Sequence, residues 1–309
     1  MRRALAALLL LLLAPGCRES ADDHLANARD ATFEKQPDEA LVEYRKALDA
    51  LRRDDSAHAT VLRARALKGA ADVYWLEQRK VKEAVSVYKE LIQQAPESTE
   101  ALEARVVLAD LLRMHYGDLR GAIDQLTAAL SRNPPQGAEL QYLVAKLYFE
   151  LGNYAQCELE ARKTAERYAS SPLVDDALFL QAQALAMLDG KRAEASRTLL
   201  ALQQRFPDSE LAPHAAFELG KLRADAGENE KAIEIWVETL KTHPKPAVVQ
   251  DAIARARRRL ALTTAEGVGD RARALARPPP APRPPARPHR TSLEAVGGKA
   301  DEAAREHGD

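Results

Sequence analysis

Histidine and cysteine are the residue types of this chain best suited to bind a metal or act as a nucleophile, and there are seven and two of them. The histidines are scattered, with no HExxH sequence and no Cys/His cluster at metal-site spacing. Gly267-Val268-Gly269 and Gly297-Gly298-Lys299 lack the further glycine and the hydroxyl residue of a phosphate-binding loop. Because no set of nucleophile, base and oxyanion donors is recognisable, we expect no enzymatic activity, no metal and no cofactor.

The composition of the chain indicates which kind of protein it is. Of its 309 residues, 46% are hydrophobic, 5% aromatic and 29% charged, a balance typical of Ala/Leu-rich helical proteins with a sizeable core. The net charge is −1, and nothing in it indicates binding of nucleic acid. Beyond Cys17 the one remaining cysteine is Cys157, so no internal disulfide is expected.

The first seventeen residues have the layout of a secretory signal. Arg2 and Arg3 precede an apolar run, residues 4–14, that is shorter than the roughly 20 residues needed to cross a bilayer, and Pro15, Gly16 and Cys17 follow it. The segment resembles the signal of bacterial lipoproteins, which implies cleavage after residue 16, a lipid on Cys17 and a linker over residues 17–21. An ordinary cleaved signal and an uncleaved anchor remain as alternatives.

Six segments repeat one pattern of helix, tight polar turn and second helix. The second helix carries a small residue near its start: Ala40, Ala84, Ala122, Cys157, Ala195 and Ala232. Four residues later come Tyr44, Tyr88, Leu126, Ala161, Leu199 and Trp236. Five of the segments close with a proline: Pro96, Pro134, Pro172, Pro207 and Pro244. A small side chain lets two helices approach closely, a larger one a turn later fills the space between hairpins, and proline ends the second helix.

These repeats resemble the tetratricopeptide repeat, with a longer spacing between copies. The resemblance implies an all-α superhelical solenoid of six helical hairpins over residues 22–246. Short segments such as Phe206-Pro207-Asp208-Ser209 also resemble one branch of that family, the periplasmic lipoproteins of outer-membrane assembly and of the Tol-Pal-associated type. This narrower resemblance agrees with a lipid anchor.

In such a solenoid the first helix of each hairpin lines a concave groove, and helical spacing predicts which residues face it. The candidate partner-binding residues are Lys68, Trp75, Arg113, Tyr142, Lys146, Phe149, Phe217 and Lys221. Asp72, Val106, Asp110, Leu180 and Met187 fall on the same face. Aromatic side chains beside lysine and arginine suit a peptide or helix partner. Packing between hairpins is the alternative role for the aromatic residues. A grip on a C-terminal carboxylate is disfavoured, because Asp72 stands where that mode needs asparagine.

Two segments follow the repeats. Residues 247–262 have one apolar stripe and a basic opposite face, and we interpret them as a capping helix that covers the last hydrophobic surface. Its arginines are expected to be solvated, with an anionic-lipid or polyanion patch as the alternative. Residues 263–309 are expected to be a disordered tail rich in proline and arginine. Within it, a chance match to the SH3-ligand pattern and a loose attraction to anionic polymers are alternatives to a plain linker.

The sequence therefore predicts a non-catalytic adaptor in a bacterial cell envelope, facing the periplasm from a lipid anchor, with the outer membrane favoured over the inner one. Its expected partner is an envelope protein or peptide segment in the groove, and no nucleic acid or small-molecule substrate is expected. The alternative function is a cell-wall accessory that binds peptidoglycan or another envelope polyanion through the groove or the basic tail.

Overall fold

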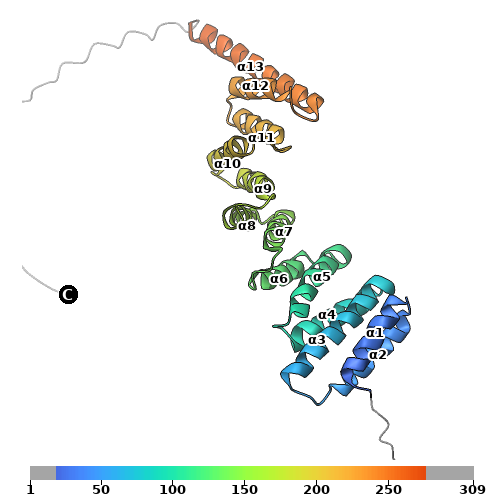
Figure 1. Cartoon of the computed structure of the whole chain (residues 1–309). Helices are drawn as coiled ribbons and strands as arrows, with labels where there is room; N and C mark the ends of the chain where they lie inside the picture. Colours follow the sequence, from blue (N-terminus) through green and yellow to red (C-terminus); the bar gives the residue numbers. More distant parts are fainter. Residues whose placement is uncertain (1–18, 276–309) are drawn as a thin grey trace, which may run out of the picture. The chain divides into compact units, whose positions relative to one another are not determined.

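The computed structural model describes residues 19–275, with side-chain surroundings for residues 19–264. Over this range the regular structure is helical and no strand is present, which confirms the predicted all-α class. Figure 1 shows the helices following one another in chain order. They are α1 (Ala21–Phe33), α2 (Pro37–Ala50), α3 (Ala57–Asp72), the π-helical turn η1 (Val73–Glu77), α4 (Val81–Gln94), α5 (Thr99–Tyr116), α6 (Leu119–Leu130), α7 (Gly137–Glu150), α8 (Tyr154–Arg167), α9 (Val174–Ala186), α10 (Arg192–Arg205), α11 (Ala212–Asp225), α12 (Asn229–Thr239) and α13 (Pro246–Leu275).

The first twelve helices pack as six hairpins, as predicted. α1 packs on α2, α3 on α4, α5 on α6, α7 on α8, α9 on α10 and α11 on α12. The second helix of each hairpin also packs on the first helix of the next, from α2 on α3 to α10 on α11. Such packing of each unit on its sequence neighbours is the architecture of a solenoid.

Every hairpin turn contains one residue in the left-handed conformation. In the last four hairpins it is Gly117, Gly152, Gly190 or Gly227, with φ between 62° and 82°, which glycine adopts without steric cost. In the first two hairpins it is Lys35 (φ 62°) and Arg79 (φ 57°). Each of the six lies five positions before the small residue of its second helix, as in Gly152 and Cys157. The turn thus sets the register of the helix that follows it.

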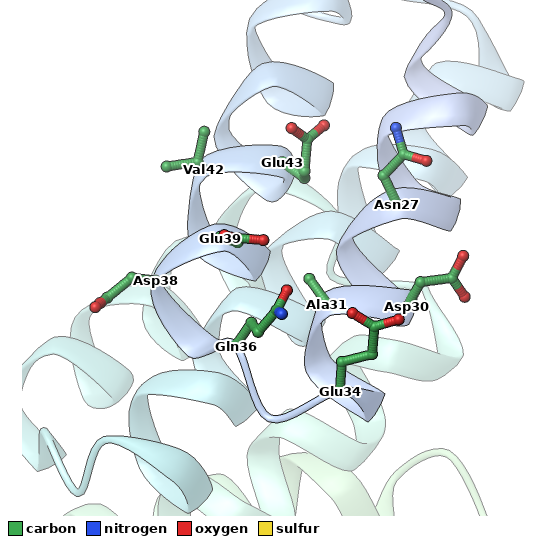
Figure 2. Close-up of a pocket in the computed structure, with 9 residues that line it drawn as sticks. All are labelled: Asn27, Asp30, Ala31, Glu34, Gln36, Asp38, Glu39, Val42 and Glu43. Atoms are coloured by element: carbon green, nitrogen blue, oxygen red, sulfur yellow. The ribbon is translucent and has the colours of Figure 1, made fainter.

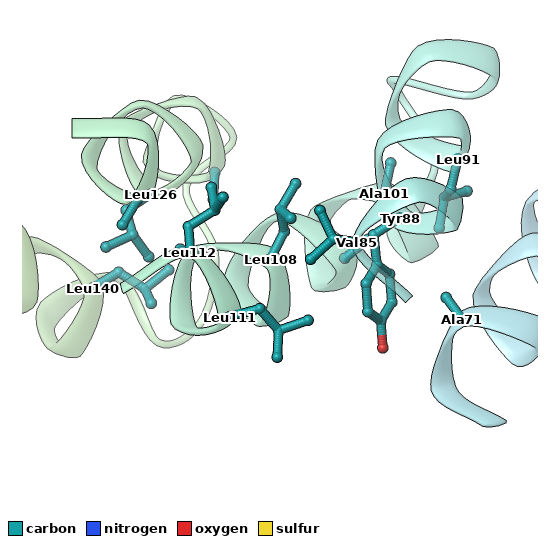
Figure 3. Close-up of a cluster of buried hydrophobic side chains, with 14 of the residues drawn as sticks. Ala71, Val85, Tyr88, Leu91, Ala101, Leu108, Leu111, Leu112, Leu126 and Leu140 are labelled. Atoms are coloured by element: carbon teal, nitrogen blue, oxygen red, sulfur yellow. The ribbon is translucent and has the colours of Figure 1, made fainter. Parts of the chain in front are cut away.

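The repeating pair of small and larger residues forms the core of each hairpin. All six small residues and all six residues four positions later are buried, and Ala40, Ala84, Cys157, Ala195 and Ala232 are 0% exposed. The largest cluster spans α3 to α7, and Figure 3 shows Tyr88, Leu108 and Leu126 among its gathered side chains. Full burial of one leucine contributes about 1.5–3 kcal/mol, so these positions supply much of the stability of each hairpin.

The closing prolines lie just beyond the second helices, as expected. Pro96 follows α4, for example, and Pro207 follows α10. One loop is also tied to the preceding loop: the Arg132 guanidinium donates to the backbone carbonyl of Glu97 at 2.7 Å and to those of Pro96 and Ser98 at 3.2 and 3.3 Å. Side chains therefore fix the spacing between two successive loops where no regular structure does.

One helix departs from regular α-helical spacing. α3 passes at Val73 into the π-helical turn η1, in which the Gln78 N–H donates to the Val73 carbonyl, five residues back. A π turn holds one more residue than an α turn, so the α-helical count that placed Trp75 on the groove face does not hold through this turn. Val73, at its start, is 1% exposed and stays in the core.

Beyond the last hairpin the prediction needs correction. Val249, Ala252, Ile253 and Ala256 of α13 are buried in a cluster with Ala232 and Trp236, as expected of a capping helix. The helix continues to Leu275, however, so residues 263–275 are helical where disorder was predicted. Ala261, Leu262 and Ala265 are strong helix formers and extend the helix past its buried contacts. Residues up to Leu260 form one compact unit and those from Ala261 belong to a second. The predicted signal and residues 276–309 lie outside the described residues.

Candidate functional site

The predicted groove residues lie on first helices of the hairpins. Lys68 is on α3, Arg113 on α5, Tyr142, Lys146 and Phe149 on α7, and Phe217 and Lys221 on α11, while Trp75 is on η1. First helices also meet across hairpins, because α1 packs on α3, α3 on α5 and α7 on α9. We call the surface of α3, α5, α7, α9 and α11 that carries these residues the first-helix face.

At its N-terminal end the first-helix face is neutralised within the chain. Lys68 lies in a cavity of about 290 Å³ between α1, α3 and α5, with its Nζ 2.8 Å from Asp72 and 3.2 Å from Glu103. Burial lowers the pKa of Lys68, but the two carboxylates outweigh it and the net shift is upward. In the same cavity Arg65 pairs with Glu100 at 3.5 Å. A partner would have to displace the chain's own carboxylates to bind Lys68.

Trp75 and Arg113 are partly engaged in packing. The Trp75 ring meets His115 edge to face, with centroids 5.3 Å apart, and the Arg79 guanidinium lies 5.9 Å from the Trp75 centroid. Arg113 pairs with Asp110 at 3.3 Å, and its Nε is buried without a hydrogen-bond partner. The contact of His115 with Trp75 was not predicted, because it depends on how the end of α5 packs against η1.

The middle of the face combines a half-buried tyrosine with an exposed lysine. Tyr142 packs against two core clusters, and burial, followed by the nearby Asp176 carboxylate, raises its pKa to about 12. Lys146 is exposed, with its Nζ 5.8 Å from the Tyr142 ring centroid. Phe149 instead packs edge to face on Tyr154 of its own hairpin, with centroids 5.2 Å apart. Lys146 is therefore the residue of the three best placed to meet a partner.

At the C-terminal end, Phe217 and Lys221 line a cavity of about 370 Å³ between α11, α12 and α13. Trp236 forms part of its wall and is fixed there, because its Nε1 donates to the Phe217 carbonyl at 3.0 Å. The Lys221 Nζ lies 6.0 Å from the Phe217 ring centroid and 2.8 Å from Glu218. Arg255 and Arg259 of α13 line the same cavity, and all four arginines from Arg255 to Arg259 are exposed, as predicted. Arg255 and Arg259 are four residues apart and so lie on the same side of α13, as do Ala252 and Ala256. This spacing is the feature of the sequence that indicated a shared surface.

Comparisons with known proteins agree with this architecture. The tetratricopeptide repeat pattern matches residues 66–98 and 176–209, which cover most of the second and fifth hairpins. The chain is similar to the C-terminal part of a TPR repeat-containing protein from Cytophaga hutchinsonii, at 13% identity and a TM-score of 0.53, over 77% of this chain and 89% of that one. A TPR protein from Parabacteroides merdae gives a TM-score of 0.44 at 16% identity over 77% and 98% of the two chains. YrrB, a TPR protein with an unusual peptide-binding site, gives 0.48 at 16% identity over 68% and 96%. No curated protein matches the sequence.

The chain folds as a tetratricopeptide-like solenoid. The similarity to the Cytophaga hutchinsonii protein, at 13% identity, supports the fold and leaves the partner open. None of the described helices combines the length and apolar character that crossing a bilayer requires.

The TPR-like solenoid has a further concavity outside the first-helix face. It lies between α1 and α2 and measures about 520 Å³. Figure 2 shows the carboxylates of Asp30, Glu34, Asp38, Glu39 and Glu43 around it, with no lysine or arginine among its lining residues. This surface was not predicted, because its carboxylates come from two helices and the turn between them.

The same hairpin brings together one histidine and two glutamates. His24 Nδ1 lies 2.7 Å from a Glu43 oxygen and 3.3 Å from a Glu19 oxygen, atoms of the kinds that bind metals. Lys46, however, occupies the other Glu43 oxygen at 2.7 Å, and with His24 it holds the pKa of that carboxyl below its usual range. The contact between His24 and Glu43 joins α1 to α2, and Lys46 occupies the remaining Glu43 oxygen, so no free ligand oxygen is left on Glu43.

Proposed function

We propose that this protein is a non-catalytic adaptor that binds a segment of a partner protein on the first-helix face, held at a bacterial envelope membrane by a lipid on Cys17. Proteins with tetratricopeptide repeats typically mediate protein–protein interactions and peptide binding. The observation that carries the proposal is the pairing of aromatic and cationic side chains on that face, Tyr142 with Lys146 and Phe217 with Lys221. Rigid helices present these groups, so little ordering is needed when a partner binds.

The one described cysteine supports a structural role. Cys157 is 0% exposed, and burial raises the pKa of its thiol to about 12. A reactive cysteine has the opposite character, an accessible thiol with a lowered pKa. Cys157 therefore serves as the small core residue of the fourth hairpin.

The partner-binding part of the proposal is tested by crosslinking and recovery from intact envelopes. Lys146→Glu reverses one exposed charge on the first-helix face, and we expect it to abolish or strongly reduce partner recovery. Tyr142→Ala is a less suitable probe, because Tyr142 packs against the core. Lys89→Glu on α4, which reverses an exposed charge on a second helix, is the matched control. Equal recovery with Lys146→Glu and Lys89→Glu, at unchanged helicity, would refute the assignment of this face.

The anchoring part of the proposal rests on the signal-like first seventeen residues and is tested separately. Replacing Cys17 with Ala should release the protein from membranes without changing its thermal unfolding, because the anchor contributes nothing to the hairpin cores. Membrane fractionation after a high-salt wash gives the readout. Retention of the variant on membranes would overturn the lipid anchor, and loss of partner recovery only at high salt would favour the polyanion alternative.

A further inference from the structure

The cavity between α11, α12 and α13, which we call the terminal pocket, has an apolar floor and a charged rim. Phe217, Trp236, Val248 and three alanines supply the floor, and Lys221, Asp225, Arg255 and Arg259 supply the rim. Its volume of about 370 Å³ lies at the lower end of the roughly 300–1,000 Å³ range of pockets that hold small molecules. The terminal pocket therefore suits one large side chain and its neighbours better than a whole helix.

The rim carries a surplus of positive charge. Its lining residues include three cations and one carboxylate, and Glu218, which does not line the cavity, pairs with Lys221 at 2.8 Å. Arg255 has no ion pair within the described part of the chain. The cavity around Lys68 differs, because there three cations face three carboxylates. Charge complementarity between surfaces supplies specificity and steers association. An acidic partner thus gains more at the terminal pocket than at the N-terminal end of the first-helix face.

The floor offers an anchoring point for an apolar side chain. Val248 is 42% exposed and Phe217 is partly buried, while the hydrogen bond from Trp236 Nε1 to the Phe217 carbonyl holds the wall rigid. Binding energy in protein interfaces concentrates where a large apolar side chain enters a preformed pocket surrounded by polar groups. The terminal pocket combines both parts of that arrangement.

We propose that the terminal pocket binds an acidic segment of a partner protein, with an apolar side chain against Phe217 and Val248 and a carboxylate at Arg255. This inference rests on the proposed function and adds the chemistry of the partner. Among the exposed arginines of α13, this inference singles out Arg255, because Arg255 lines the cavity and Arg258 does not.

The test uses the intrinsic fluorescence of the full chain. The protein has two tryptophans, so Trp75→Phe leaves Trp236 in the pocket wall as the one reporter. The probe is the capped peptide EEDFLEDE, and its two controls are the neutral peptide QQNFLQNQ and the peptide EEDAAEDE without apolar anchors. We expect the probe to bind about tenfold or more tightly than either control, because each control removes one of the two recognised features.

Matched substitutions on α13 locate the binding. Arg255→Glu should weaken binding of the probe about tenfold or more, and Arg258→Glu, the same charge change away from the pocket, should change it less than about twofold. Equal losses in both variants would reduce the effect to net charge and overturn the proposal, as would unchanged binding with Arg255→Glu. If Lys146→Glu abolishes partner recovery while Arg255→Glu leaves both recovery and peptide binding intact, the terminal pocket is rejected and the proposed function stands.

Discussion

Tyr88 of α4 donates a hydrogen bond of 2.6 Å to the Asp72 carboxylate of α3, and the two residues join both helices of the second hairpin. The other oxygen of the same carboxylate accepts a hydrogen bond from Lys68 at 2.8 Å. Burial and the Asp72 carboxylate both raise the pKa of Tyr88, so the phenol keeps its proton and remains a donor. The first-helix face is thereby linked to the core.

Tyr88→Phe tests this link. Tyr88 is 0% exposed and its hydroxyl bonds to a charged group, so we expect the free energy of unfolding to fall by about 1.5–3 kcal/mol. Tyr148→Phe is the control, because no hydrogen bond of the Tyr148 hydroxyl is found within the described residues, and it should change stability by less than about 0.5 kcal/mol. Urea unfolding of both variants measures the difference, and equal effects would contradict the role of the hydrogen bond.

Cys157→Ala should be tolerated and should alter stability at alkaline pH. Alanine fills the same slot in the other five hairpins, so at pH 7 we expect a loss below about 1.5 kcal/mol. Burial raises the thiol pKa to about 12, and the unfolded value is about 8.5. The folded state therefore binds more protons between these values, and the thiol's contribution is lost as pH rises, by up to about 1.4 kcal/mol per unit.

Unfolding in urea under reducing conditions at pH 8 and pH 10 measures this effect. The difference in stability between the wild type and Cys157→Ala should shift in favour of the variant at the higher pH, while the tyrosines titrate alike in both proteins. A difference that does not change with pH would show that the thiol is accessible or already ionised.

Lys35→Gly should relieve backbone strain in the first turn. Lys35 has φ 62°, where a side chain costs about 1–2 kcal/mol that glycine avoids, although glycine is more disordered when unfolded. Its ion pair with Glu77 is largely exposed and contributes little. We expect Lys35→Gly to be more stable than Lys35→Ala by about 1 kcal/mol, because both lose the ion pair and glycine alone relieves the strain.

Gly152→Ala is the mirror experiment for the same turn position. Gly152 has φ 72°, and an added Cβ would meet no other atom, so only the backbone conformation opposes alanine there. We expect the free energy of unfolding to fall by about 1 kcal/mol. Thermal unfolding of the three variants provides the measurement. Equal stability of Lys35→Gly and Lys35→Ala would show that the turn is not strained.

Gly220→Ala tests close packing beneath the terminal pocket. An added Cβ would overlap the indole of Trp236, which is 3% exposed and held by its hydrogen bond to the Phe217 carbonyl. We expect a loss of about 1–3 kcal/mol despite the better helix propensity of alanine. The loss should shrink when Trp236→Leu is present, because the overlap is then removed. Additive effects in the double variant would place the cost elsewhere.

Much of the fold could be predicted because the repeat places the same demand on each hairpin. The position near the start of each second helix, occupied for example by Ala84 and Cys157, must hold a small residue because two helices approach closely there. Its recurrence in the sequence therefore predicts six hairpins before any contact is known. Lys35 and Arg79 could not be predicted as left-handed residues, because their side chains give no sign of that conformation.

The candidate site was less predictable than the fold. Spacing along one helix placed Lys146 and Phe217 on the first-helix face, but Glu103 reaches Lys68 from the next hairpin, and Arg255 reaches the terminal pocket from the last helix. Such contacts depend on the packing of neighbouring helices, and the residue spacing within one helix does not predict that packing. The π turn at Val73 adds a shift that the regular count omits.

The constant offset between the left-handed turn residue and the small residue also bears on how the chain tolerates changes of length. The offset is five residues in every hairpin, whereas the distance from a small residue to the next left-handed one varies, for example from Ala40 to Arg79 and from Cys157 to Gly190. Residues gained or lost in that second interval leave each second helix in register with its own turn. An insertion between the left-handed turn residue and the small residue would instead rotate the second helix and expose the side chains that it buries in the core. Natural length variants of this protein should therefore cluster between hairpins and spare the five-residue step.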